Sequence, residues 1–221
     1  LIGGAASSTT IVTDDFAPDA VDDMFATDED TQVDGDLTGA NPDTEDSDAD
    51  GDDLTVLTVT DEDGVTSAAD GTAIILPSGA ILRVNADGTF TYDPFGETSG
   101  EGSESDTKFD QLAENAIDTD TFTYNVADGN GGVDTATVTV TVMGINDNPV
   151  AADDTFNVSE TGSVSGNVIT GQQGPDADPE GDDLTLTRIN GVLLATLDED
   201  GSADGTQISL GLGGLLTIFA D

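Results

Sequence analysis

An internal repeat constrains this chain more than any other feature of its sequence. The segment DSDADGDDLTVLTV, which begins at Asp46, is matched by DADPEGDDLTLTRI from Asp176. The segment ADGTAIILPSGAILRVNAD from Ala69 is matched in the same way by ADGTQISLGLGGLLTIFAD from Ala203. The copies are separated by roughly 130 residues, which is the size of a globular domain and not of a solenoid turn. The sequence therefore predicts similar domains in tandem.

The register of the repeat predicts where these domains begin and end. Residues 1–13 align with the strand that precedes the second copy, so they are expected to be the last strand of a preceding repeat. Residues 14–144 are expected to form one complete domain. Residues 145–221 are expected to form an incomplete second domain, because Asp221 aligns with Asp87, which leads into the strand pattern GTFTYDPF in the first copy.

The pattern of apolar residues is that of an all-β protein. The stretch TFTYNVADGNGGVDTATVTVTV at residues 121–142 alternates apolar with polar residues on both sides of a glycine-rich turn, and it predicts a long hairpin. Shorter runs of the same kind predict strands at residues 54–59, 80–84, 89–92 and 184–189. Short strands with frequent turns predict a β-sandwich, and no segment predicts a helix longer than one turn.

Three local patterns are expected to be structural. Phe90, Tyr92, Phe122 and Tyr124 alternate at strand spacing, and half of them are expected in the core. GLGGLL at residues 211–216 is similar to a dinucleotide-binding loop, but it aligns with the turn LPSGAIL and is expected to belong to a hairpin. DGNGGVD at residues 128–134 is expected to be a tight hairpin turn, because calcium-binding nonapeptides of that kind occur in many stacked copies.

The composition is extremely acidic, with 47 Asp and Glu residues against 3 Lys and Arg residues and a formal net charge of −44. Nucleic acids and anionic membranes are excluded as partners, because both require a basic surface. No Cys or His is present, which excludes disulfides, thiolate and imidazole ligands and His-based catalysis. No apolar run predicts membrane insertion. Such acidity is typical of a halophile-type surface, a disordered chain or a chain that binds divalent cations, and the clean strand alternation argues against disorder.

Each copy of the repeat carries a carboxylate cluster immediately before a predicted strand. The clusters are Asp46, Asp48, Asp50 and Asp52 in the first copy and Asp176, Asp178, Glu180 and Asp182 in the second. Carboxylates at alternate positions beside a glycine that permits a sharp turn can surround a hard cation such as Ca²⁺. Neither loop is an EF-hand, because Leu57 and Thr187 stand where that motif requires Glu. The alternative is a solvated acidic turn, and recurrence in both copies favours the cation site.

The stretch VADGNGGVDTATVTVTVMGINDNPV at residues 126–150 resembles the last two strands and the linker of cadherin repeats. It is especially similar to the bacterial cadherin-like and VCBS-type tandem repeats of large secreted adhesins of the RTX type. The strand ADDTFNVSE, the D-x-D loop, the strand ADGTFTY and the hairpin follow in the order of that family. The resemblance implies tandem cadherin-like (immunoglobulin-like) Greek-key β-sandwich domains, with Ca²⁺ bound at the junctions between them.

The resemblance also implies which residues hold the calcium. In that family the ligands come from a glutamate of the first strand, from the linker and from the D-x-D loop of the following domain. The corresponding residues are Glu29, Glu160, Asn146, Asp147, Asn148, Asp48, Asp50, Asp178 and Glu180, together with Asp14 and Asp15 at the first junction and Glu114 near the later strands. Gly144 replaces the Asp that opens the animal linker motif, so fewer ions are expected at that junction.

These observations predict a non-enzymatic, calcium-rigidified extender or adhesion repeat of a large extracellular bacterial protein, with neighbouring repeats of the same chain as partners. Glycoside cleavage is not expected, because the acidic clusters lie in polar loops and not in an apolar pocket that would raise the pKa of one acid. Two alternatives stay open. One is a subunit of an extracellular filament or sheath, closed by strand exchange with other copies, and the other is a module that binds surface polysaccharide.

Overall fold

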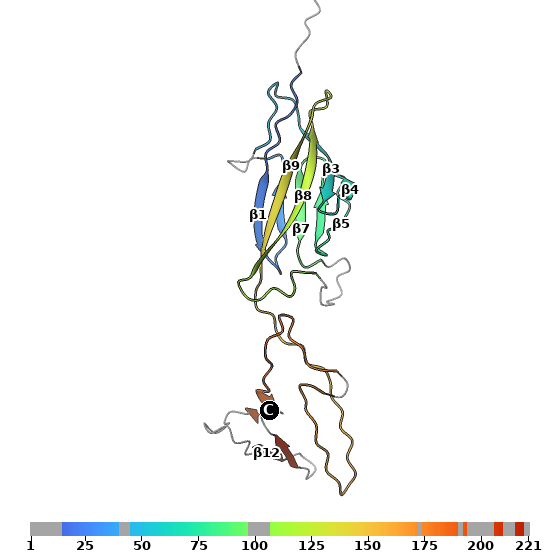
Figure 1. The fold of residues 1–221 in the computed structure, drawn as a ribbon, viewed down its shortest axis with the longest axis vertical. Coiled ribbons are helices and arrows are strands. Elements are labelled where there is room, and N and C mark those ends of the chain that lie inside the picture. The colour runs from blue at the N-terminus through green and yellow to red at the C-terminus, as the bar shows by residue number, and fades with distance from the viewer. Residues whose placement is uncertain are drawn as a thin grey trace, which may run out of the picture. The chain divides into compact units, whose positions relative to one another are not determined.

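The structure, a computed structural model, describes residues 15–39, 45–96, 107–171, 174–189, 192–193, 206–209 and 215–218. The chain divides into two compact units, Leu1–Asn146 and Asp147–Asp221 (Figure 1). The boundary between them lies close to the one that the repeat predicts at residue 144. The strand predicted at residues 1–13 lies outside the described residues, and the incompleteness of the second domain stays a prediction.

The first unit is a sandwich of two sheets. One sheet has five strands in the order β1-β9-β8-β3-β4, which are Asp23–Asp28, Val133–Met143, Ile117–Ala127, Thr55–Asp61 and Thr66–Ala68. The other has four strands in the order β2-β7-β6-β5, which are Val33–Asp36, Thr89–Asp93, Ile81–Val84 and Ile74–Ile75. No helix occurs in the part of the chain that the structure describes. The predicted all-β sandwich is confirmed.

The first two strands divide between the sheets and define the two ends of the unit. β1 pairs in parallel with β9, from Asp23 opposite Val138 to Asp28 opposite Met143, and β2 then pairs antiparallel with β7 in the other sheet. Because β1 and β9 run in the same direction, the segment before β1 and the turn between β8 and β9 lie at one end, which we call the entry end. We call the opposite end, where β9 finishes, the exit end.

The hairpin of β8 and β9 is the longest element of the fold. The two strands pair from Ile117 opposite Met143 to Ala127 opposite Val133, which confirms the hairpin predicted at residues 121–142. Along β9, buried residues from Ala136 to Val142 alternate with threonines on the other face. Threonine suits these outer positions, because its branched side chain favours a strand while its hydroxyl stays in contact with water.

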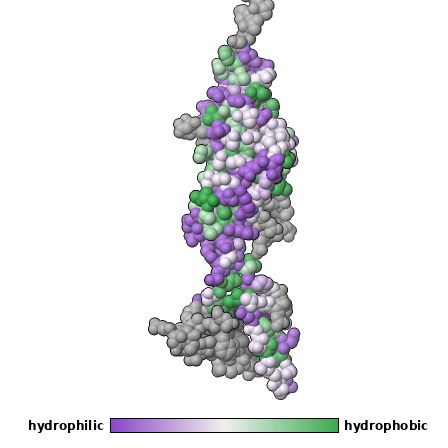
Figure 2. Space-filling model, viewed as in Figure 1, coloured by the Kyte–Doolittle hydropathy of each residue, from purple (hydrophilic) through white to green (hydrophobic). Residues whose placement is uncertain are grey.

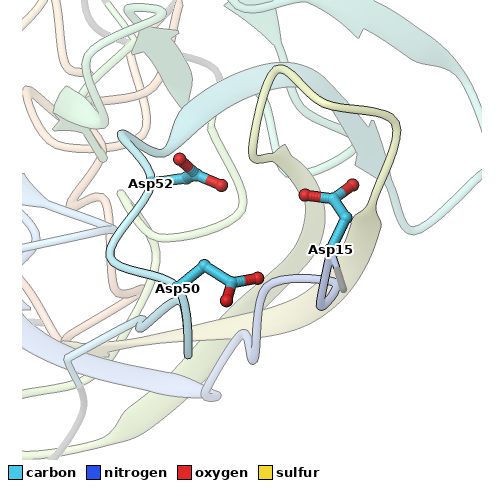
Figure 3. Close-up of side chains that lie close together, drawn as sticks. All are labelled: Asp15, Asp50 and Asp52. Carbon is cyan, nitrogen blue, oxygen red and sulfur yellow. The ribbon is translucent and has the colours of Figure 1, made fainter. Parts of the chain in front are cut away.

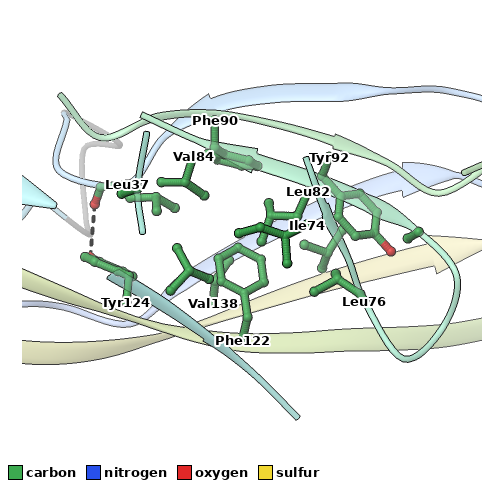
Figure 4. Packing of buried hydrophobic residues seen from close by; sticks show 14 of the residues in the cluster. Leu37, Ile74, Leu76, Leu82, Val84, Phe90, Tyr92, Phe122, Tyr124 and Val138 are labelled. Atoms are coloured by element: carbon green, nitrogen blue, oxygen red, sulfur yellow. Dashed lines mark hydrogen bonds between the residues drawn. The ribbon is translucent and has the colours of Figure 1, made fainter. Parts of the chain in front are cut away.

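The core lies between the two sheets and receives side chains from both (Figure 4). Phe90, Tyr92, Phe122 and Tyr124 are all at most 2% exposed, so the expectation that only half of them lie in the core is wrong. Residues two positions apart on a strand point to the same face, so both members of each pair enter the core together. Phe25 of β1 packs edge-on against Phe90, with ring centroids 4.8 Å apart.

The second unit contains two short antiparallel pairs among its described residues. β10 (Arg188–Ile189) pairs with β11 (Val192–Leu193), and β12 (Thr206–Ser209) pairs with β13 (Leu215–Ile218). The strand predicted at residues 184–189 is therefore limited to its last two residues. The pairing of β12 with β13 agrees with the interpretation of GLGGLL as part of a hairpin.

Candidate metal centre

The acidic loop at the entry end is a tight turn organised by one carboxylate. Oδ1 of Asp48 accepts hydrogen bonds from the backbone N–H groups of Asp50 at 2.8 Å and Asp52 at 3.3 Å. The N–H of Gly51 donates to the carbonyl oxygen of Asp48 at 3.2 Å. Gly51 has a φ of 79°, which glycine adopts without the steric cost that a Cβ imposes. The positions of Asp50 and Asp52 are thus defined relative to Asp48.

Three of the predicted ligands, Asp15, Asp50 and Asp52, come together at this end (Figure 3). One carboxylate oxygen of each lies within 4.8 Å of the other two. The backbone N–H of Phe16 donates to Oδ2 of Asp50 at 2.8 Å and holds the entering segment against the loop. Asp14, which the sequence also predicts as a ligand, lies outside the described residues. Carboxylates grouped in this way are the hard oxygen donors that Ca²⁺ takes.

Asp128, which the sequence predicts only as part of a tight turn, also belongs to the entry end. Its side chain is buried, and its Oδ1 accepts hydrogen bonds from the N–H groups of Asn130, Gly131 and Gly132 at 2.7, 3.0 and 3.0 Å. The side-chain amide of Asn130 donates to Oδ2 of Asp52 at 2.7 Å, which joins this turn to the acidic loop. The sequence does show an acidic residue in this turn. That the turn lies beside the segment before β1 follows only from the strand topology, so the sequence alone could not identify Asp128 as part of the site.

Two buried carboxylate oxygens test whether a cation fits these residues. Oδ2 of Asp48 and Oδ2 of Asp128 are buried and have no hydrogen-bond partner among the described residues. A buried carboxylate oxygen without a donor is costly, and a bound cation removes that cost. The donor set and these two oxygens are therefore compatible with a divalent cation.

The negative charges of this group repel the carboxylate of Asp15. Desolvation raises the pKa of Asp15, and the negative charges of Asp128, Asp52, Asp50 and Asp48 raise it further. Burial opposes the ionisation of Asp128, but the donated backbone N–H groups outweigh it and lower the pKa of that carboxyl. Hydrophilic residues are also spread over the visible face of the first unit (Figure 2). A bound cation would relieve the repulsion that Asp15 experiences.

Asp46, a predicted ligand, is placed differently from its neighbours in the loop. It is 5% exposed, its Oδ1 accepts the N–H of Val21 at 2.8 Å, and its Oδ2 accepts the hydroxyl of Tyr124 at 2.8 Å. Burial raises the pKa of Asp46 against the lowering effect of these two hydrogen bonds. Both oxygens are engaged, so the structure gives Asp46 the geometry of an anchor for the loop.

Glu29 and Glu114 lie at the exit end. Glu29 is 2% exposed, its Oε1 accepts the N–H of Ile145 at 2.7 Å, and its own N–H donates to the carbonyl of Met143 at 3.1 Å. Glu114 is exposed, in a loop that is tied to the end of β9 by the N–H of Asn115 donating to the carbonyl of Gly144 at 2.9 Å. Glu29 is thus fixed where the chain leaves the first unit, whereas Glu114 faces solvent.

The acidic loop of the second unit repeats the geometry of the first. The N–H of Asp182 donates to Oδ1 of Asp178 at 3.1 Å, and Gly181 has the same φ of 79° as Gly51. The N–H of Asp147 donates to Oε1 of Glu180 at 2.7 Å. Oδ1 of Asp176 accepts the N–H of Ala152 at 2.8 Å, as Asp46 accepts that of Val21. The other predicted residues of this region, Asn146, Asn148 and Glu160, are exposed.

Two family models match this chain. That of the bacterial cadherin-like domain matches residues 15–144, and that of a bacterial Ig domain matches residues 146–214. The first match covers more than half of the chain, which therefore belongs to the bacterial cadherin-like domain family. Domains of these two kinds are typically non-enzymatic structural modules of cell-surface or secreted proteins, and they indicate an adhesion or extender repeat.

Other comparisons add little. No curated protein matches the chain. Among solved structures, a nucleoside hydrolase-related hypothetical protein from Saccharophagus degradans, associated with carbohydrate metabolism, is 12% identical with a TM-score of 0.32. That match covers 59% of this chain and 26% of the other, and it carries no argument about function. In the described part of the chain, no helix is long and apolar enough to cross a membrane.

Proposed function

We propose that this chain is a calcium-stabilised extender or adhesion repeat of a large extracellular bacterial protein of the RTX adhesin type. In this proposal bound Ca²⁺ restricts motion between successive domains. The observation that carries it is the grouping of Asp15, from the segment entering the first unit, with Asp50 and Asp52 of the acidic loop. The two matching domain families supply the structural and extracellular context.

The proposed site draws on three segments that are far apart in the sequence. Asp15 comes from the entering segment, Asp48, Asp50 and Asp52 come from the loop, and Asp128 comes from the turn between β8 and β9. Ca²⁺ takes about six to eight oxygen ligands in flexible geometry, whereas Mg²⁺ demands a near-ideal octahedron and keeps several waters. An all-carboxylate set on three separate loops therefore favours Ca²⁺ over Mg²⁺.

Charge neutralisation supplies the mechanical effect. Two carboxylates about 4 Å apart repel each other by about 1 kcal/mol in water and by about 4 kcal/mol near a protein surface. A divalent cation replaces that repulsion with attraction to every carboxylate around it. The entering segment, with Asp15 and Phe16, is then held on the acidic loop, and bending of the chain at this point becomes costly.

We extend the proposal to the linker that follows the first unit. The candidate ligands there are Glu29, Asn146, Asp147, Asn148, Asp178 and Glu180, with Glu114 and Glu160 as further candidates. Support comes from the second acidic loop, which repeats the turn and the hydrogen bond from linker to loop of the first. Neighbouring repeats are the partners that such a site would join.

Thermal unfolding of the full chain in chelator and in rising Ca²⁺, with Mg²⁺ as the comparison ion, tests the proposal. We expect the melting temperature to rise at Ca²⁺ concentrations on the order of 1 mM and much less with Mg²⁺. The double variant Asp50→Asn with Asp52→Asn should lose a large part of the shift. Asp63→Asn, on an exposed turn after β3, is the matched control. An equal response to any salt, or no response, would contradict calcium binding.

A further inference from the structure

The hydroxyl of Tyr124 lies where the segments that supply the proposed ligands meet. Tyr124 is fully buried on β8, and four oxygens surround its hydroxyl. They are Asp46 Oδ2 at 2.8 Å, Leu37 O at 3.1 Å, Val21 O at 3.4 Å and Asp23 Oδ2 at 3.5 Å. A phenol has only one hydroxyl proton to donate, so the acceptors from these separate segments share it. The shortest contact of the hydroxyl is to the carboxylate of Asp46. Figure 4 draws the bond to Leu37.

The contacts of this hydroxyl join the entering segment to the acidic loop. Asp46 Oδ2 accepts the Tyr124 hydroxyl, while Asp46 Oδ1 accepts the N–H of Val21 at 2.8 Å. We call the two hydrogen bonds that Asp46 accepts, from Tyr124 and from Val21, the clasp. Beside the clasp, Asp19 and Ser47 exchange two backbone hydrogen bonds, of 2.8 and 3.1 Å. Asp15 precedes the clasp on one segment, and Asp48, Asp50 and Asp52 follow it closely on the other. Their relative positions therefore depend on the clasp.

The third segment is the strand that carries Tyr124 itself. β8 ends at Ala127, and Asp128 follows immediately. The spacing from Tyr124 to Asp128 is set by a paired strand, which is stiff over this length. The three segments that supply the carboxylates are thus tied within a few residues of a single hydroxyl.

We propose that the Tyr124 hydroxyl is a positioning group for the calcium site of the first unit. It does not touch the ion, and it fixes the spacing of the entering segment, the acidic loop and the β8–β9 turn before the ion binds. This inference rests on the proposed function. A site whose ligands are held in place beforehand loses less entropy on binding, so removal of the hydroxyl weakens calcium binding while the aromatic ring still fills the core.

Tyr92 offers a matched control within the same core. It is also fully buried, and its hydroxyl donates to a buried carboxylate, Oδ2 of Asp120, at 2.7 Å. It lies at the other end of the labelled core residues in Figure 4. Tyr92→Phe and Tyr124→Phe therefore each remove a hydrogen bond from a buried tyrosine hydroxyl to a buried aspartate. Only the hydrogen bond of Tyr124 belongs to the clasp.

Calcium titration calorimetry of the full chain, with thermal unfolding in chelator, tests the inference on the wild type and both variants. The calcium-binding step that disappears in the double variant Asp50→Asn with Asp52→Asn identifies the site of the first unit. We expect Tyr124→Phe to weaken binding at that site about three- to tenfold, and Tyr92→Phe to change it by less than about twofold, although both lower the melting temperature in chelator.

Asp46→Asn provides a second variant that leaves the tyrosine in place. It should produce a similar selective loss of calcium affinity, and adding it to Tyr124→Phe should cost little more, because the two groups act as one unit. A wild type without calcium binding would contradict the proposed function itself. A wild type that binds calcium, with affinity reduced equally or not at all by Tyr124→Phe and Tyr92→Phe, would overturn only the role of Tyr124.

Discussion

Phe16 and Asp50 are joined by a hydrogen bond of 2.8 Å from the backbone N–H of the first to the carboxylate of the second. In the second unit Asp147 donates in the same way to Glu180 at 2.7 Å. The residues differ at both positions, yet the contact is retained because its donor belongs to the main chain. The segments before the two domains can therefore differ in sequence, TDDFAP against GINDNP, and still close onto similar acidic loops.

Asp128→Asn should separate the proposed metal-binding role of this residue from its structural role. An amide oxygen still accepts the three N–H groups that Oδ1 holds, so the chain should fold in chelator with little change in melting temperature. The lost charge should weaken calcium binding on the order of tenfold, measured by calorimetry. Asp63→Asn is the control, and an unchanged affinity in Asp128→Asn would exclude Asp128 from the ligands.

Gly132→Ala should disturb the same site through a steric clash. A Cβ at Gly132 would meet Oδ2 of Asp128 and would lie 2.7 Å from Cα of Ala17, so the turn and the entering segment must move apart. We expect a lower melting temperature and weaker calcium binding. Gly51→Asn is the comparison, because Asn tolerates a positive φ and the space beside Gly51 is open. Equal behaviour of the two variants would show that the close approach at Gly132 has no consequence.

Acid sensitivity in chelator should depend on Asp134. The N–H of Ala20 donates to this carboxylate at 2.9 Å, and this bond, with a second from Thr135, lowers its pKa below the ordinary value of 3.8. The unfolded chain then binds the proton more readily, so the contribution is present above pH 3.8 and is lost as the pH falls through the folded-state value. Asp134→Asn should remove this contribution, which is about 1 kcal/mol or less. The unfolding free energy of the variant should therefore fall less steeply as the pH decreases below 3.8. A slope as steep as that of Asp63→Asn would contradict this.

Asp120→Ala should destabilise the first unit without changing its affinity for calcium. Asp120 is 3% exposed and accepts hydrogen bonds from Ser78 at 2.6 Å and Tyr92 at 2.7 Å, while Nζ of Lys108 lies 3.6 Å away. Its removal leaves two buried hydroxyls without their acceptor, which should cost about 3 kcal/mol of unfolding free energy in denaturant titrations. The cost should be the same in chelator and in Ca²⁺. A cost that appears only with Ca²⁺ would connect this network to the metal site.

The fold was predictable where the signal is local. The hairpin of β8 and β9 follows from the alternation of its own residues, and so does the burial of Phe122 with Tyr124, since residues two apart share a face. The number of aromatic residues in the core was underestimated because Phe90 and Tyr92, like Phe122 and Tyr124, were considered one at a time. Two residues that share a face of a strand are buried together.

The candidate site was predictable only in part, because its geometry depends on contacts between distant segments. Asp46 and Asp50 occupy equivalent places in an alternating acidic run, and spacing cannot distinguish them. Asp46 is engaged by Val21 and Tyr124, which lie 25 and 78 residues away in the chain, whereas Asp50 meets Asp15. Asp128 was missed for the same reason, since its neighbours are set by the parallel pairing of β1 with β9.

That parallel pairing determines how the unit responds to tension. A load applied between the segment before β1 and the segment after β9 pulls the two strands in opposite directions along their common axis. The ladder over Asp23–Asp28 is then loaded in shear, so its hydrogen bonds resist together. A hairpin pulled at its open end would instead break its bonds one after another. The first unit therefore presents its stronger mechanical direction along the chain, which is the direction in which tension on the backbone acts.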